Sequence, residues 1–293
     1  MARILAISSQ VARGHVGLSA IVPALQALGH EVIGLPTVLL SNHPGHPHVA
    51  GQQISVDVLT RMFAALEANG WLDEIDAVLT GYLPTVAHVE FARRAIDRVR
   101  AVNSAAVVLC DPVLGDEPKG LYIPQDTARA IGDHLLGVAG IATPNAFEAS
   151  FLAGVRIVSE ATATCAAALL NGPSLMVIKS VPGAEPSELL NLVVCNGNPV
   201  ARARVLRRKE APHGTGDMLA ALVLACRLDR LPAGRLLSLV TAQVDAVLAA
   251  SEGRNELCLT HLARCFAGAA PWPIESLRED AGAGAADRQP ECR

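Results

Sequence analysis

Residues 3–40 read RILAISSQVARGHVGLSAIVPALQALGHEVIGLPTVLL, and the order of apolar runs in this stretch predicts the fold class. Residues 4–7 are a continuous apolar run before two serines, a pattern typical of a strand buried on both faces of a parallel sheet. Residues 18–28 have the length and period of a helix that ends at Gly29, and residues 32–40 are extended again. The stretch therefore predicts a β-α-β unit.

The same alternation continues along the chain. We expect further helices at residues 55–68, 86–102, 125–136, 146–152 and 161–170, and further strands at residues 77–79, 105–110 and 175–178. Residues 189–195 and 200–206, joined by an Asn-Gly-Asn-Pro turn, have the pattern of a hairpin. The predicted fold is α/β, with a doubly wound, mostly parallel central sheet that is flanked by helices and gains some antiparallel strands late in the chain.

Length and composition favour one domain. The chain has 293 residues, of which 51% are hydrophobic, and this is enough for one large buried core. We assign residues 1–268 to this domain, with its last helices near residues 231–250 and 256–266. Residues 269–293 lose the apolar period and are rich in Ala, Gly, Pro and charge. We expect them to be a disordered tail that carries no chemistry.

Charge and cysteine content restrict the class of partner. The formal net charge is −4, and basic residues are scattered apart from residues 202–209, so neither nucleic acid nor a membrane is an expected partner. The seven cysteines include no Cys-x-x-Cys pair, which indicates reduced thiols. The first apolar run is too short for a secretion signal or a membrane span. We expect a cytoplasmic protein with small, soluble ligands.

Gly214-Thr215-Gly216-Asp217 precedes an apolar, alanine-rich helix. A Gly-x-Gly turn at a helix start leaves backbone N–H groups unpaired, and these groups form an anion pocket that suits phosphate. A carboxylate repels a phosphate, so its presence beside this pocket needs a reason, such as accepting a proton from an attacking hydroxyl. Asp217 therefore indicates phosphoryl transfer. The alternative is an ordinary helix start, with Thr215 as its cap and Asp217 placed against the helix dipole.

Polar residues follow most of the predicted strands. Ligands of parallel α/β sheets bind at the carboxyl ends of the strands, so these residues could together hold a phosphorylated cofactor, a metal and a small substrate. They are Ser9, Ser41-Asn42-His43, Thr80-Gly81-Tyr82, Asp111, Thr143-Pro144-Asn145 with Glu148, and Lys179. Residues 112–124, rich in Pro and Gly, are expected to be a mobile flap without regular structure beside this site.

Seven segments, in their order and spacing, are similar to those of a known family. From about residue 3 to residue 250 the chain resembles the pyridoxal kinases of the ribokinase-like superfamily. The superfamily shares Gly-x-Gly-Asp, whereas Ser-Asn-His and Thr-Gly-Tyr are particular to the pyridoxal kinase branch. The segments are Gly14-His15-Val16-Gly17, Ser41-Asn42-His43, Thr80-Gly81-Tyr82, Cys110-Asp111-Pro112-Val113-Leu114-Gly115, Thr143-Pro144-Asn145-Ala146-Phe147-Glu148, Lys179 and Gly214-Thr215-Gly216-Asp217.

The resemblance implies an ATP-dependent kinase of vitamin B6 salvage. Its substrate would be the 5′-hydroxymethyl group of pyridoxal, and also of pyridoxine or pyridoxamine. Asp217 would accept the proton of that hydroxyl, while the N–H groups of Gly214, Thr215 and Gly216 stabilise charge on the transferred oxygens. The relatives are commonly homodimers, so a homodimer is expected.

The resemblance also implies the cofactor residues. Asp111 and Glu148 are expected to act on Mg²⁺, partly through water, because a small hard cation is held by one or two carboxylates plus phosphate oxygens. The alternatives are a turn aspartate and a first-turn helix glutamate. A monovalent cation is a second candidate cofactor. The other residues expected on the nucleotide are Thr143, Asn145, Lys179, Tyr122, Glu210, Ala211, Pro212 and His213.

The substrate side departs from the family. Ser9, Asn42, His43 and Tyr82 are expected to bind the vitamer together with Asp217. Pro44 stands where relatives usually have a substrate-binding Thr, and Gln10 stands where many have His. Proline offers neither a hydroxyl nor an N–H, so the vitamer preference is open, and His43 or His46 is a candidate substitute.

Two other hypotheses for the function stay open. One is another small-alcohol kinase of the superfamily, acting on a hydroxymethylpyrimidine or a sugar. The other is a diverged, non-catalytic protein that binds a vitamer or a nucleotide. The three histidines of residues 43–48 also permit a metal site, although the stiff prolines and the lack of a second cluster favour a solvated loop.

Overall fold

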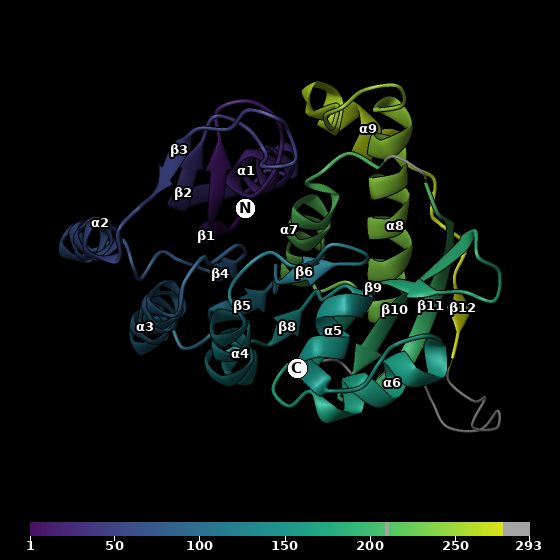
Figure 1. Cartoon of the computed structure of the whole chain (residues 1–293). Coiled ribbons are helices and arrows are strands. Elements are labelled where there is room, and N and C mark those ends of the chain that lie inside the picture. The colour runs from purple at the N-terminus through teal and green to yellow at the C-terminus, as the bar shows by residue number, and fades with distance from the viewer. Residues whose placement is uncertain (209–210, 278–293) are drawn as a thin grey trace.

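The computed structural model describes residues 1–208 and 211–277, and its centre is one large sheet (Figure 1). Its strands are β1 (Arg3–Val11), β2 (Glu31–Leu40), β3 (Gly51–Gln53), β4 (Ala77–Thr80), β5 (Val107–Cys110), β8 (Ile141–Ala142), β9 (Leu175–Pro182), β10 (Glu188–Cys195), β11 (Asn198–Leu206) and β12 (Glu275–Ser276). They lie in the order β12-β11-β10-β9-β8-β5-β4-β1-β2-β3. The pairings from β2 to β9 are parallel, and the outer ones are antiparallel.

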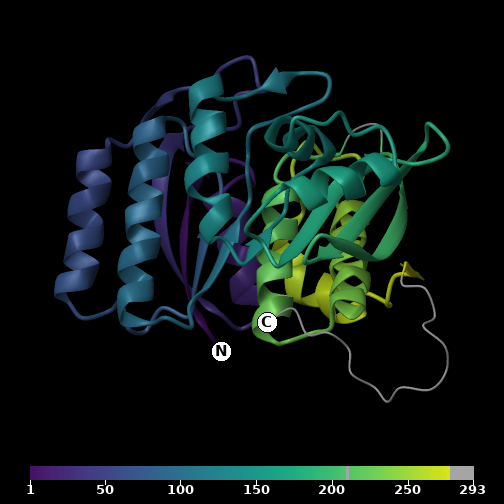
Figure 2. The same cartoon turned by 90° about the horizontal axis from the view of Figure 1, so that it is seen from below.

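Helices cover both faces of the sheet (Figures 1 and 2). One face carries α1 (Leu18–Ala27), α7 (Thr215–Leu228), α8 (Ala233–Ala250) and α9 (Leu262–Gly268). The other face carries α2 (Val56–Ala68), α3 (Val86–Val102), α4 (Gln125–His134), α5 (Ala146–Ala153) and α6 (Glu160–Leu169). The predicted fold class, a mostly parallel doubly wound sheet with late antiparallel strands, is confirmed.

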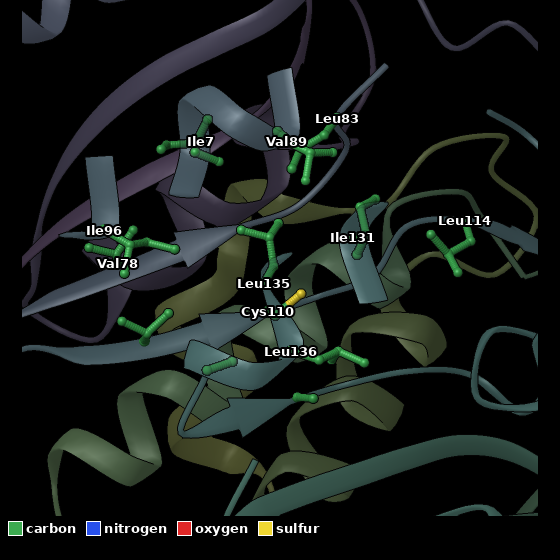
Figure 3. Packing of buried hydrophobic residues seen from close by; sticks show 14 of the residues in the cluster. Ile7, Val78, Leu83, Val89, Ile96, Cys110, Leu114, Ile131, Leu135 and Leu136 are labelled. Carbon is green, nitrogen blue, oxygen red and sulfur yellow. The ribbon is translucent and has the colours of Figure 1, made fainter. Parts of the chain in front are cut away.

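Two apolar cores, one on each face, explain the continuous apolar runs of the central strands. Successive side chains of a strand point to opposite faces. In β1, Leu5 and Ile7 therefore enter the core under α2–α6, whereas Ile4 and Ala6 enter the core under α1 and α7–α9. Figure 3 shows part of the first core, in which Val78 of β4 lies next to Ile96 of α3. All of these side chains are excluded from solvent.

Helix α8 is, within the described residues, the one helix that is long and apolar enough to cross a membrane by length and composition. Half of it is buried inside the protein. Its buried side chains, such as Leu236, Leu237 and Val240, belong to the core that α1 and α7 share. Its apolar character is therefore explained by its place in that core.

Two segments differ from the sequence-based expectations. The flap at residues 112–124 contains the short antiparallel pair β6 (Gly115–Asp116) and β7 (Gly120–Leu121). Glycine permits this pair, because a Cβ on Gly115 would lie 2.1 Å from the Gly120 carbonyl oxygen. The last helix, expected from residue 256, begins at Leu262 after a 3₁₀ turn, Leu259–His261, and the Cys258 N–H ahead of that turn donates to the Ser251 hydroxyl at 2.8 Å.

The expectation of a disordered tail from residue 269 is wrong for residues 269–277. Strand β12 pairs with β11, which extends the sheet beyond the expected domain boundary at residue 268. Glu275 forms ion pairs with Arg202 and Arg204, and the Trp272 indole N–H donates to the Arg204 carbonyl at 2.9 Å. The basic run of β11 thus binds this segment. Residues 278–293 lie outside the described residues.

Candidate active site

The predicted site residues lie at one edge of the sheet because parallel strands place their carboxyl ends together. Asp111 directly follows β5, and Thr143 directly follows β8. Lys179 lies within β9, and its backbone bridges to Asn145 in the parallel sense. Asp217 lies in the first turn of α7. The topology therefore gathers residues that are far apart in the chain.

Asp111 and Lys179 form a buried ion pair. The Lys179 ammonium donates to Asp111 Oδ1 at 2.9 Å, and the Thr143 hydroxyl donates to the same oxygen at 2.7 Å. The two charged side chains are only 11% and 5% exposed. Burial alone would lower the pKa of Lys179, but the carboxylates of Asp111 and Glu148 outweigh that effect and raise it. Lys179 is therefore a permanent positive charge at this edge of the sheet.

Glu148 closes a capping box at the start of α5. Its Oε2 accepts the Asn145 N–H at 2.7 Å, and the Asn145 side chain accepts the Glu148 N–H at 2.9 Å. Its Oε1 accepts the Leu114 N–H at 3.1 Å, which ties α5 to the flap. Burial, followed by the charge of Asp111, raises the pKa of Glu148 to about 8 against the opposing effect of Lys179. Its expected role on Mg²⁺ stays a prediction.

The start of α7 has the geometry of an anion pocket. The first helical hydrogen bond runs from the Met218 N–H to the Gly214 carbonyl at 3.0 Å, so the preceding N–H groups have no partner within the helix. Gly214 has a φ of 89°, and a Cβ there would lie 1.6 Å from the His15 carbonyl oxygen. The alternative in which Thr215 caps the helix is wrong, because Gly214 is the cap and the Thr215 hydroxyl donates to the Pro212 carbonyl.

Asp217 lies between the anion pocket and the ends of the first strands. Burial, followed by the charge of Asp111, raises its pKa to about 6, while the Gly17 N–H and Lys179 act in the opposite direction. A Cβ on Gly216 would lie 3.3 Å from the Lys179 ammonium, and one on Gly81 would lie 3.9 Å from Asp217 Oδ1. Asp217 is thus a carboxylate that can bind and release a proton near neutral pH.

The first-strand serines are placed differently from the prediction. Strand β1 continues to Val11, so Ser8 and Ser9 lie within it rather than after it. Ser8, which sequence reasoning missed, is fully buried, and its hydroxyl accepts the Tyr82 N–H at 3.1 Å. Ser9 is half-buried beside Gly17, where a Cβ would lie 2.2 Å from its hydroxyl. The carbonyl of Tyr82 accepts the hydroxyl of Thr37 in β2 at 2.8 Å. The backbone of the half-buried Tyr82, which follows β4, is thus bonded to both β1 and β2.

The loop after β2, residues 41–50, is held mainly by its own hydrogen bonds. The Asn42 amide donates to the His43 and His48 carbonyls, and its oxygen accepts the Ser41 hydroxyl at 2.6 Å. Its side chain is thus engaged inside the loop. Pro44 is exposed. Among the described residues, no three His, Cys, Asp or Glu side chains are grouped as metal ligands, in this loop or elsewhere.

The flap contributes Tyr122 and Asp116. Tyr122 is 44% exposed as a residue; burial raises the pKa of its hydroxyl, and the hydrogen bond with Asp116 raises it further. Asp116 Oδ1 is buried without a hydrogen-bond partner among the described residues. Sequence reasoning missed Asp116 as a site residue, although it is the second acid of the Asp-Pro-Val-Leu-Gly-Asp segment.

Ala211, Pro212 and His213 precede the anion pocket, and the predicted Glu210 lies outside the described residues.

A buried carboxylate, a buried ammonium and helix N–H groups without an intrahelical partner meet at the end of a doubly wound sheet. The N–H groups and the ammonium suit the charge of a transferring phosphoryl group, and the carboxylate suits the proton of an attacking hydroxyl. The fold and the site together define a kinase that phosphorylates a small alcohol.

Comparison with known proteins narrows this class. A family model described as phosphomethylpyrimidine kinase matches residues 18–234. The chain is 34% identical over 254 residues to pyridoxal kinase PdxY of Deinococcus radiodurans, covering 84% of this chain and 85% of the relative. It is 34% identical over 239 residues to human pyridoxal kinase, covering 76% of each. The solved pyridoxal kinase of Leishmania donovani in complex with ADP and pyridoxamine matches with a TM-score of 0.88 at 30% identity, covering 94% of this chain and 99% of that chain.

The chain therefore belongs to the phosphomethylpyrimidine kinase family and, within it, to the pyridoxal kinases.

Proposed function

We propose that this protein transfers the γ-phosphoryl group of ATP to the 5′-hydroxymethyl group of pyridoxal, and also of pyridoxine and pyridoxamine. The observation that carries the proposal is the placement of Asp217 at the anion pocket of α7, within electrostatic reach of Lys179. The solved relatives from Leishmania donovani that hold ADP with pyridoxamine or with pyridoxine support the two ligand classes.

The residues of the chain divide the chemistry between them. Asp217 accepts the proton of the substrate hydroxyl as that oxygen attacks the γ-phosphorus. The N–H groups of Thr215 and Gly216 then stabilise the charge on the transferred oxygens. Lys179 adds a fixed positive charge beside Gly216. The flap, with Tyr122, closes over the nucleotide and excludes water, which competes with the substrate hydroxyl.

The residues present fit a magnesium ion, with one change from the sequence-based expectation. The buried Oδ1 of Asp116 has no hydrogen-bond partner among the described residues and suits a hard cation. Asp111 would hold the ion together with Asp116, and Glu148 would act on it through water, because backbone N–H groups already occupy both of its oxygens. Mg²⁺ supplies charge neutralisation on the phosphate oxygens when it is bound.

The proposal assigns no site to a monovalent cation, because Lys179 already supplies a positive charge to both Asp111 and Glu148. It retains the cytoplasmic homodimer that the resemblance implies. Sedimentation of the purified protein measures that assembly.

The experiment is a coupled ADP-release assay with Mg-ATP against pyridoxal, pyridoxine, pyridoxamine, hydroxymethylpyrimidine and ribose. We expect turnover of at least one vitamer and none of ribose. Turnover of hydroxymethylpyrimidine alone identifies another kinase of the superfamily. Vitamer binding in isothermal titration without turnover identifies a non-catalytic binder, and either result contradicts the proposal.

A further inference from the structure

Two histidines from distant parts of the chain stack against each other. His43 comes from the loop after β2, and His213 directly precedes Gly214 of the anion pocket. Their ring centroids are 3.7 Å apart, and their planes differ by 22°. The contact thus joins the loop expected to bind the vitamer to the backbone that holds the transferring phosphoryl group.

The loop is shaped around this stack. The Gly45 N–H donates to His43 Nδ1 at 3.0 Å, so the proton of a neutral His43 ring lies on Nε2. A Cβ on Gly45 would lie 2.9 Å from His43 Nδ1 and 3.3 Å from His213 Nε2. The absence of a side chain at Gly45 therefore lets the loop turn against both rings.

A second contact holds the same loop from the other side. His46 Nε2 lies 3.4 Å from Glu256 Oε1, in the segment after α8, and the His46 N–H donates to the His43 carbonyl. The Glu256 carboxylate packs on Gly14, where a Cβ would lie 2.6 Å from its Oε2. The loop after β2 is thus attached both to His213, which precedes the anion pocket, and to the segment after α8 that packs on Gly14.

The surroundings favour uncharged rings. The charged groups that act on the pair are Lys119 and Asp116 of the flap, His46 of the loop and Glu256 after α8. Burial, followed by His213 and Lys119, lowers the pKa of His43 to about 4, and burial also lowers the pKa of His213. Two neutral imidazoles stack without the mutual repulsion that two imidazolium ions would have.

We infer that the His43–His213 stack is a latch that holds the loop after β2 closed against the anion pocket, and that His213 is a positioning residue for the vitamer. The inference rests on the proposed function and deepens it. Pro44 offers no hydroxyl or N–H to the substrate, so the position of the loop as a whole has to supply part of the vitamer affinity. The latch fixes that position without itself contacting the reacting atoms.

The test compares His213→Ala with His213→Phe, which keeps an aromatic ring for stacking. His213→Ala is expected to raise the KM for pyridoxal roughly three- to tenfold, the range of one aromatic pair, with little change in kcat. His213→Phe is expected to restore a KM within about twofold of the wild type. The dissociation constant for pyridoxal, from isothermal titration, should follow the same pattern.

The matched control is His48→Ala, an exposed histidine of the same loop, which should leave the KM unchanged. In NMR titration the pKa of His43 should rise from about 4 toward its ordinary value in His213→Ala. Equal dissociation constants in wild type, His213→Ala and His213→Phe overturn the latch. Absence of turnover in the wild type contradicts the proposed function instead, and the titrations still test the latch.

Discussion

The phosphoryl-transfer end of the site and the loop after β2 are held in place in different ways. At the first, side chains from separate strand ends contact one another in a buried network, as Lys179 and Thr143 do on Asp111. In the loop, Asn42 bonds to its own neighbours, and side-chain contacts to other elements come from His43 and His46. In the proposed function the chemistry is therefore built into the fold, whereas ring selection is assigned to a loop that can change without disturbing the sheet.

The largest expected effect on turnover is at the phosphoryl-transfer end of the site. Asp217→Asn keeps the shape of the side chain but cannot accept the proton of the substrate hydroxyl. We expect kcat to fall on the order of a thousandfold, the scale for removal of a positioned base, with ATP binding retained. Single-turnover kinetics measure the fall, and Asp229→Asn at the exposed end of α7 is the control.

The pH profile gives a second readout of the same prediction. The pKa of Asp217 is raised to about 6, and only the deprotonated form accepts a proton. The kcat/KM of the wild type should therefore fall as the pH drops through about 6, and the residual rate of Asp217→Asn should lack this limb. Near-normal turnover in that variant refutes the assigned base.

The sequence predicted where the residues of this region lie, for a physical reason. Asp111, Thr143, Lys179 and Asp217 each lie at or near a strand end or a helix start, and a parallel sheet brings such positions together. Ser8 was missed because its contact with the Tyr82 N–H depends on where β1 ends and on its register with β4. A shift of one residue along a strand changes the face of every side chain, and local patterns do not encode that register.

The loop region was less predictable. The pairing of His43 with His213 depends on how two loops meet in space, and neither loop has a periodic pattern that would place its side chains. The tail segment was missed for a similar reason. Glu275 binds Arg202 and Arg204 through charge, so β12 forms without the apolar alternation by which strands are recognised.

A comparable effect, on stability rather than on turnover, is expected at the buried ion pair. Lys179→Met leaves Asp111 and Glu148 without their positive partner, and removal of one member of a buried pair costs about 3–5 kcal/mol of unfolding free energy. Urea denaturation measures the loss, and Lys119→Met, an exposed lysine of the flap, is the control.

In the proposal Lys179 also takes the place of a monovalent cation, so wild-type turnover should be equal in potassium and tetramethylammonium buffers. A strict potassium requirement contradicts that assignment.

The smallest expected effect is in the loop and sharpens the contrast between the two regions. Pro44→Thr supplies a hydroxyl and an N–H where the family usually has them, and one added hydrogen bond is worth about 0.5–1.5 kcal/mol. The KM for pyridoxal should therefore fall about fivefold, while kcat and the KM for ATP stay unchanged, as initial-rate kinetics would show. Pro47→Thr, at another exposed proline of the loop, should change none of these constants. If Pro44→Thr alters kcat more than KM, the loop takes part in the chemical step, and the separation of catalysis from ring selection is wrong.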